Sequence, residues 1–80
     1  MTAPQPREVS APLTDRELAV LDLVAGGLIT VAIARRLGIS PRTVAKHLEQ
    51  AYRKLDANDR VSAVLRASSL GLIPAQPSRR

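Results

Sequence analysis

One predicted helix ends and another begins within the stretch Ile33-Ala34-Arg35-Arg36-Leu37-Gly38-Ile39-Ser40-Pro41-Arg42-Thr43-Val44. Gly38 predicts the end of the first helix, because glycine tolerates the left-handed conformation in which helices commonly stop. Ser40 is a typical N-cap, and Pro41 suits the first position of a helix, where its missing amide costs nothing. Two helices separated by so short a turn cannot lie parallel, so the stretch indicates a helix-turn-helix.

Two helices are predicted in the chain up to this turn. The first starts at a capping box formed by Thr14 and Glu17 and stops at Gly26. Its inward face is expected to consist of Leu18, Leu21, Val24 and Ala25. Thr30 can cap a second, short helix that runs to about Leu37. The residues expected to point inward from it are Ile33, Ala34 and Leu37.

The helix that follows the turn has an apolar stripe at helical spacing, made of Val44, Leu48, Ala51 and Leu55. A fourth helix is predicted from a cap at Asn58 or Asp59 to about Leu70, and residues 71–74 then close the domain. The only aromatic side chain, Tyr52, is expected to pack against the fourth helix rather than to offer its hydroxyl to a phosphate.

The composition favours an all-α domain with four helices. Hydrophobic residues make up 45% of the chain and aromatic residues only 1%, so the core must be built from aliphatic side chains. The domain is expected to span residues 13–73. A flexible tail or linker is expected at 1–12, which holds three prolines, and a flexible basic tail at 74–80.

Several classes of function are excluded by what the sequence does not contain. The chain has no cysteine and a single histidine, so neither a thiolate site nor a histidine cluster can hold a metal. We also find no paired carboxylates, no nucleophile with a base and no phosphate-binding glycine loop. No apolar run approaches the roughly 20 residues of a membrane span. We therefore expect a cytoplasmic protein with no cofactor that is not an enzyme.

The charge favours a polyanionic partner. The net charge is +5, and such an excess acts on association and binding rather than on fold. On the helix after the turn, a polar arc points away from the apolar stripe and suits a DNA major groove. It consists of Arg42, Lys46, Glu49, Gln50 and Arg53. The alternative is a merely solvated face, but the preceding turn and helix favour DNA.

From Leu13 to Ala67 the sequence closely resembles the LuxR-type helix-turn-helix family, which includes NarL/FixJ response regulators, GerE-like proteins and quorum-sensing regulators. The resemblance rests on Leu13-Thr14-Asp15-Arg16-Glu17, Ile33-Ala34-Arg35-Arg36-Leu37-Gly38-Ile39-Ser40, Pro41-Arg42-Thr43-Val44, His47-Leu48 and Tyr52-Arg53-Lys54-Leu55. It implies a transcriptional regulator whose third helix enters the major groove of double-stranded DNA. It also implies a homodimer on DNA that pairs through the fourth helix.

The family's base-reading positions correspond to Ala45, Lys46 and Glu49, with Gln50 as a neighbour. Lys46 can donate to guanine, whereas Ala45 stands where the family often has lysine and offers only a methyl group. Glu49 either accepts from cytosine or pairs with a nearby cation, and we favour the pairing. The candidates for phosphate contacts are Thr30, Arg42, Thr43, His47, Arg53 and Lys54. His47 is equally well explained as a packing residue.

The fourth helix is apolar on two sides, and the sequence leaves open which of them pairs with a second copy. One stripe consists of Val61, Val64, Leu65 and Ser68, and the other of Ala63, Ala67 and Leu70. One side can face the core while the other makes the contact of a two-fold dimer. A helix wholly buried in a larger protein would show the same pattern.

The start of the second helix departs from the family. Ile29-Thr30-Val31-Ala32 stands where the family commonly has a polar Ser-Asn-Lys-Glu type of sequence. The change is expected to weaken DNA affinity or to provide a patch for a protein partner. Our main hypothesis is a sequence-specific DNA-binding regulator, either standalone or the output domain of a larger protein. The alternative is a protein-interaction co-regulator on the same scaffold.

Overall fold

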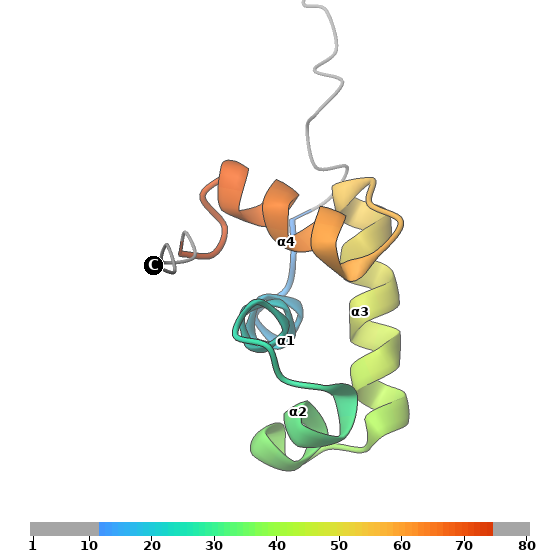
Figure 1. Ribbon diagram of the computed structural model, residues 1–80. Coiled ribbons are helices and arrows are strands. Elements are labelled where there is room, and N and C mark those ends of the chain that lie inside the picture. Colours follow the sequence, from blue (N-terminus) through green and yellow to red (C-terminus); the bar gives the residue numbers. More distant parts are fainter. Residues whose placement is uncertain (1–11, 75–80) are drawn as a thin grey trace, which may run out of the picture.

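The structure is a computed structural model that describes residues 12–74. Within these residues the chain forms four helices and no strand, which confirms the all-α expectation (Figure 1). The helices are α1 (Asp15–Ala25), α2 (Thr30–Leu37), α3 (Pro41–Leu55) and α4 (Arg60–Ser69). The expected tails at 1–12 and 74–80 lie, apart from Pro12 and Pro74, outside the described residues.

Helix α1 begins as predicted but presents a different face. Thr14 and Glu17 form the capping box, with the Glu17 amide 3.1 Å from the Thr14 Oγ1. The buried residues of α1 are Glu17, Val20, Leu21 and Val24. Ala25 is half-buried and packs against the core, whereas the prediction that Leu18 belongs to this face is wrong. The helix is turned so that the carboxylate of Glu17 also faces inward, where it meets a lysine of α3.

Helix α2 is capped by its backbone alone. Its N-cap is Ile29, whose backbone is extended and whose side chain makes no capping hydrogen bond. The prediction that Thr30 is the cap is therefore wrong, because Thr30 is the first helical residue. A capping side chain accepts hydrogen bonds from the first-turn amides only when it stands one position earlier, at the N-cap. The end is as predicted, because Gly38 adopts the left-handed conformation with φ of 70°.

Helix α3 follows the sequence pattern closely. The Ser40 hydroxyl accepts a hydrogen bond from the Thr43 amide at 3.1 Å, and Pro41 occupies the first turn. All four residues of its predicted apolar stripe are buried, namely Val44, Leu48, Ala51 and Leu55. Tyr52 is half-buried and packs against the core; its expected contact with the fourth helix stays a prediction. The helix ends at Asp56, which takes the left-handed conformation with φ of 57°.

The remaining three helices lie on one side of α3. Figure 1 shows α1, α2 and α4 all to the left of α3, so the opposite side of α3 is free of other helices. Asp59 caps α4 through the Ser62 amide at 2.8 Å. The shared core consists of Val20, Leu21, Val24, Ile33, Ala34, Val44, Leu48, Leu55, Ala63, Ala67 and Ile73. The fold thus buries one face of α3 and leaves another for a partner.

Candidate nucleic-acid interface

The polar side chains of α3 form two separate stripes. Residues of an α-helix follow one another at about 100° around its axis, so positions three and four apart share a face. The exposed stripe consists of Arg42, Lys46, Glu49 and Arg53, flanked by exposed Ala45. The second stripe is half-buried and consists of Thr43, His47, Gln50 and Lys54. Only the first stripe stands clear of the other helices.

One carboxylate lies within the exposed stripe. Glu49 is 3.8 Å from the guanidinium of Arg53, one turn further along α3, which confirms the pairing favoured from the sequence. The side chains of Arg53 and Glu49 are 74% and 69% exposed. An exposed pair of this kind contributes little to stability, about 0.3–0.5 kcal/mol, so either partner can leave the other for a ligand.

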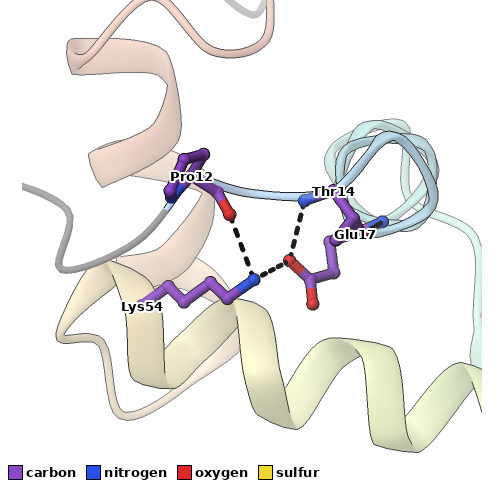
Figure 2. A network of polar contacts seen from close by, with 4 residues as sticks. All are labelled: Pro12, Thr14, Glu17 and Lys54. Atoms are coloured by element: carbon purple, nitrogen blue, oxygen red, sulfur yellow. Dashed lines mark hydrogen bonds and ion pairs between the residues drawn. The ribbon is translucent and has the colours of Figure 1, made fainter.

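Lys54 lies at the border between the polar and the buried faces of α3. Its ammonium donates to Glu17 Oε1 at 2.8 Å and to the Pro12 carbonyl at 3.1 Å, as Figure 2 shows. The same Glu17 oxygen accepts the Thr14 amide at 3.0 Å. The Glu17 side chain is 2% exposed and that of Lys54 is 21% exposed. The charge of Lys54 is therefore directed into the domain.

The environment of Glu17 favours its ionised form. Burial by itself raises the pKa of this carboxyl group. The hydrogen bonds from Lys54 and from the Thr14 amide, together with the charges of Lys54 and His47, outweigh the burial. The net result is a pKa below the ordinary value of 4.5. Glu17 is consequently ionised at neutral pH, and Lys54 is its partner.

Two other predicted phosphate contacts are half-buried as well. The Thr43 hydroxyl lies 2.9 Å from the Ser40 hydroxyl in the cap of α3. Thr30 is half-buried in the first turn of α2. Beside it, Ile29 and Val31 are 64% and 50% exposed, so the start of α2 presents apolar rather than basic side chains.

Two exposed cations of α2 were missed by the sequence analysis. Arg35 and Arg36 lie in the last turn of the helix and are both exposed. The helical period around buried Ile33 and Ala34 could have shown them to face solvent. They add positive charge to the helix that precedes the turn.

The two apolar stripes of α4 have different environments. Ala63 and Ala67 are fully buried in the core, so they cannot contact a second copy, whereas Leu70 of the same stripe is 38% exposed. Of the other stripe, Val61 and Leu65 are 65% and 64% exposed. The Ser68 hydroxyl is buried and finds no hydrogen-bond partner within the described residues.

An open pocket of about 210 Å³ adjoins the exposed stripe of α4. It is lined by Val24, Ala25, Arg60, Val61, Val64 and Leu65. Arg60 is held near the α1–α2 loop, where its guanidinium donates to the Leu28 carbonyl at 3.4 Å. The contribution of α1 to this surface was not predicted from the sequence, where Val24 and Ala25 were expected only on the inward face of the helix.

The described residues offer no site for a metal and no membrane span. No group of three or more potential ligands gathers anywhere in residues 12–74. No helix in the same part of the chain is long and apolar enough to cross a membrane. The fold and the exposed cationic stripe instead define a helix-turn-helix DNA-binding domain.

Comparison with known proteins specifies the family. Residues 11–67 match the bacterial regulatory proteins of the luxR family. The chain is 46% identical over 61 residues to the transcriptional regulatory protein YdfI of Bacillus subtilis, which covers 76% of this chain and 29% of YdfI. It is 48% identical over 61 residues to the quorum sensing-dependent transcriptional regulator RpaR of Rhodopseudomonas palustris, covering 76% of this chain and 25% of RpaR.

The solved structure of the transcription factor GerE is similar as well. It matches with a TM-score of 0.73 and 33% identity, covering 76% of this chain and 91% of the GerE chain. The chain thus corresponds to less than a third of YdfI and RpaR but to nearly all of that GerE chain. It belongs to the luxR family of bacterial regulatory proteins, which are DNA-binding transcription regulators and not enzymes.

Proposed function

We propose that this domain binds double-stranded DNA in a sequence-specific manner, with α3 in the major groove. The observation that carries this proposal is the exposed, cationic stripe of α3. The major groove admits an α-helix and presents a distinct pattern of donors and acceptors for each base pair. A bacterial regulator of this kind acts on DNA in the cytoplasm, so we place the domain there.

The base-reading role rests mainly on Lys46. This residue is exposed at the middle of the cationic stripe and can donate to guanine O6 or N7. Ala45 beside it can contact a thymine methyl group. Glu49 must leave Arg53 before it can accept from a cytosine amine. Gln50 is half-buried and belongs to the edge of the reading surface.

The phosphate contacts are best supported for Arg42 and Arg53. Both are exposed at the two ends of the cationic stripe, where cations can fix the helix on the backbone without reading bases. The half-buried Thr43, His47 and Thr30 are candidates at the edge of the groove. We leave Lys54 out of this set, because its ammonium already has two acceptors inside the domain.

We further propose that two copies pair through α4 on a two-fold DNA site. The contact surface is the stripe of Val61, Val64, Leu65 and Ser68, and the adjoining pocket receives apolar side chains of the second copy. Exposed Val61 and Leu65 are the large apolar groups of α4 that the single chain leaves in water. Burying each of them contributes roughly 1.5–3 kcal/mol, before the cost of association.

Selection of binding sites from random DNA, followed by footprinting, tests this function. We expect two half-sites in inverted orientation, about one helical turn apart from centre to centre. Affinity for the selected site should fall steeply with salt, because each phosphate neutralised adds about −0.9 to the slope of log K against log salt. A chain that selects no sequence and shows no salt dependence would contradict the proposal.

A second candidate role concerns the start of α2. The exposure of Ile29 and Val31 favours a protein partner at this surface, since polar side chains would be expected beside a phosphate. In that case Ile29→Asp should leave the affinity for the selected DNA unchanged but abolish regulation of a reporter gene. If the reporter responds to the variant as to the original chain, this second role is excluded.

A further inference from the structure

We propose that Lys54 is a positioning residue of DNA binding: it fixes the C-terminal end of α3 against α1 and does not itself contact DNA. The inference rests on the proposed function, because it concerns the orientation of α3, the helix proposed to enter the major groove. It also changes the role that the sequence suggested, in which Lys54 neutralises a phosphate.

One atom of Lys54 joins three parts of the chain. Its Nζ donates to Glu17 Oε1 at 2.8 Å and to the Pro12 carbonyl at 3.1 Å. Glu17 is in the first turn of α1 and is itself held by the Thr14 amide at 3.0 Å. The last turn of α3 is thereby tied both to the start of α1 and to the residue where the chain enters the domain (Figure 2).

The apolar stripe of α3 cannot fix the helix in the same way. Hydrophobic contacts are non-directional, so a helix held by them alone can roll by a small angle at little cost. Charge-assisted hydrogen bonds are short and directional. At the other end, α3 is held by the turn that follows Gly38. Lys54 supplies the corresponding restraint at the C-terminal end. A roll of α3 would move Arg42, Lys46 and Arg53 together relative to the DNA.

The surroundings of Lys54 also argue against a phosphate contact. Turning its ammonium outward would leave the carboxylate of Glu17, which is 2% exposed, without its cation. An unpaired buried charge is strongly destabilising. The neighbouring Arg53 is 74% exposed and pairs with Glu49 on the surface. The two adjacent cations therefore differ in role although they carry the same charge.

The experiment compares Lys54→Met with the matched control Arg53→Met on the DNA site selected by the original chain. Unfolding is first followed for each variant, and affinity is then measured at a temperature where the variant is fully folded. Titrations over a range of salt give both the affinity and the slope. We expect Lys54→Met to weaken binding by about fivefold or more, the lower end of typical coupling between sites, with an unchanged slope. Arg53→Met should reduce the slope by about 0.9.

Two results would overturn the proposal. If Lys54→Met reduces the slope of log K against log salt as much as Arg53→Met does, Lys54 is a phosphate contact. If folded Lys54→Met binds the selected DNA with the original affinity, Lys54 only stabilises the fold. If Lys54→Met does not fold, Glu17→Gln/Lys54→Met, which removes both charges, is measured with the same expectations. Absence of salt-dependent binding by the original chain would instead contradict the proposed function.

Discussion

Glu17 is a charged residue at a position where the helical period places a core side chain. It is 2% exposed and remains ionised because Lys54 and the Thr14 amide donate to it. The sequence contains the motif that caps α1, but nothing in it indicates that the same carboxylate also meets a lysine 37 positions away. A prediction from the helical period therefore places Leu18 on the buried face of α1 and leaves out Val20.

The charge of Glu17 predicts a pH dependence of stability. Because its pKa is lowered in the folded state, its contribution is complete above the ordinary value of 4.5 and is lost as the pH falls through the lowered pKa. We expect Glu17→Gln to lower the free energy of unfolding by about 1.5–3 kcal/mol at neutral pH, the range for hydrogen bonds to charged groups. The difference between variant and original should shrink below about pH 4.5.

Urea unfolding at a series of pH values measures this effect. The control is Asp22→Asn, which removes an exposed carboxylate from the same helix and should keep the acid-dependent loss. A Glu17→Gln variant whose difference from the original is the same at every pH would contradict the assignment.

Lys46 carries a prediction on specificity. Lys46→Ala should relax the preference at one base pair of each half-site by about 1–3 kcal/mol. Arg42→Ala, by contrast, should weaken binding to all sequences about equally. Competition titrations with singly substituted sites distinguish the two. Equal losses on every site in Lys46→Ala would remove Lys46 from the base-reading set.

At the scale of the helices, the turn between α2 and α3 could be predicted almost completely. Gly38, Ser40 and Pro41 act through their own backbone preferences, so their local sequence is sufficient. The start of α2 could not be predicted as well. Thr30 is a good capping residue, but the extended backbone falls on Ile29, which shows that the path of the preceding loop decides where the helix begins.

The same difference holds for the candidate site. The exposed stripe of α3 follows from the helical period, and its members were all predicted, but Gln50, predicted to share that face, is half-buried. The half-buried stripe differs, because Lys54 faces a partner that α1 supplies, and Thr43 contacts Ser40 in the N-cap of α3 itself. Their polar character made them candidates for phosphate contacts. Only the packing of α1 against α3 shows that Lys54 is already engaged.

Gly38 allows a prediction on the turn itself. An alanine there must keep φ near 70°, and the left-handed conformation costs a residue with a Cβ roughly 1–2 kcal/mol. Gly38→Ala should therefore lower the stability by about that amount, although its Cβ would meet no atom within 4 Å. Chemical denaturation gives the value.

The matched control is Gly26→Ala. Gly26 ends α1 with φ of −79°, and its nearest contact with an added Cβ is an ordinary 3.5 Å. This substitution should stabilise the protein by about 0.4–1 kcal/mol, because it restricts the unfolded chain. Equal effects of the two substitutions would contradict the explanation by backbone conformation.

At the scale of the whole molecule, the packing decides which side of α4 is available. The sequence shows two apolar stripes and treats them alike. In the folded chain the small Ala63 and Ala67 allow α4 to approach the core closely, whereas the larger Val61 and Leu65 remain in water. Residue volume could have suggested this assignment, because close packing of helices favours small side chains.

Pairing through α4 is tested by Leu65→Lys. A buried lysine without a partner opposes the contact, so affinity for a two-half-site DNA should fall by about a hundredfold, the lower end of what linking two sites supplies. Affinity for a single half-site should stay unchanged. Ser69→Lys adds the same charge at an exposed position outside the apolar stripe and serves as the control. Equal losses on one and two half-sites would argue against the dimer.

Tyr52 has a consequence of a different kind. The chain contains no tryptophan and no other aromatic residue, so its intrinsic ultraviolet fluorescence comes from a single phenol ring. That ring sits half-buried on α3, packed against the core. Its emission therefore reports the docking of one helix rather than an average over the molecule. Helix α3 carries its own optical label, with no dye attached.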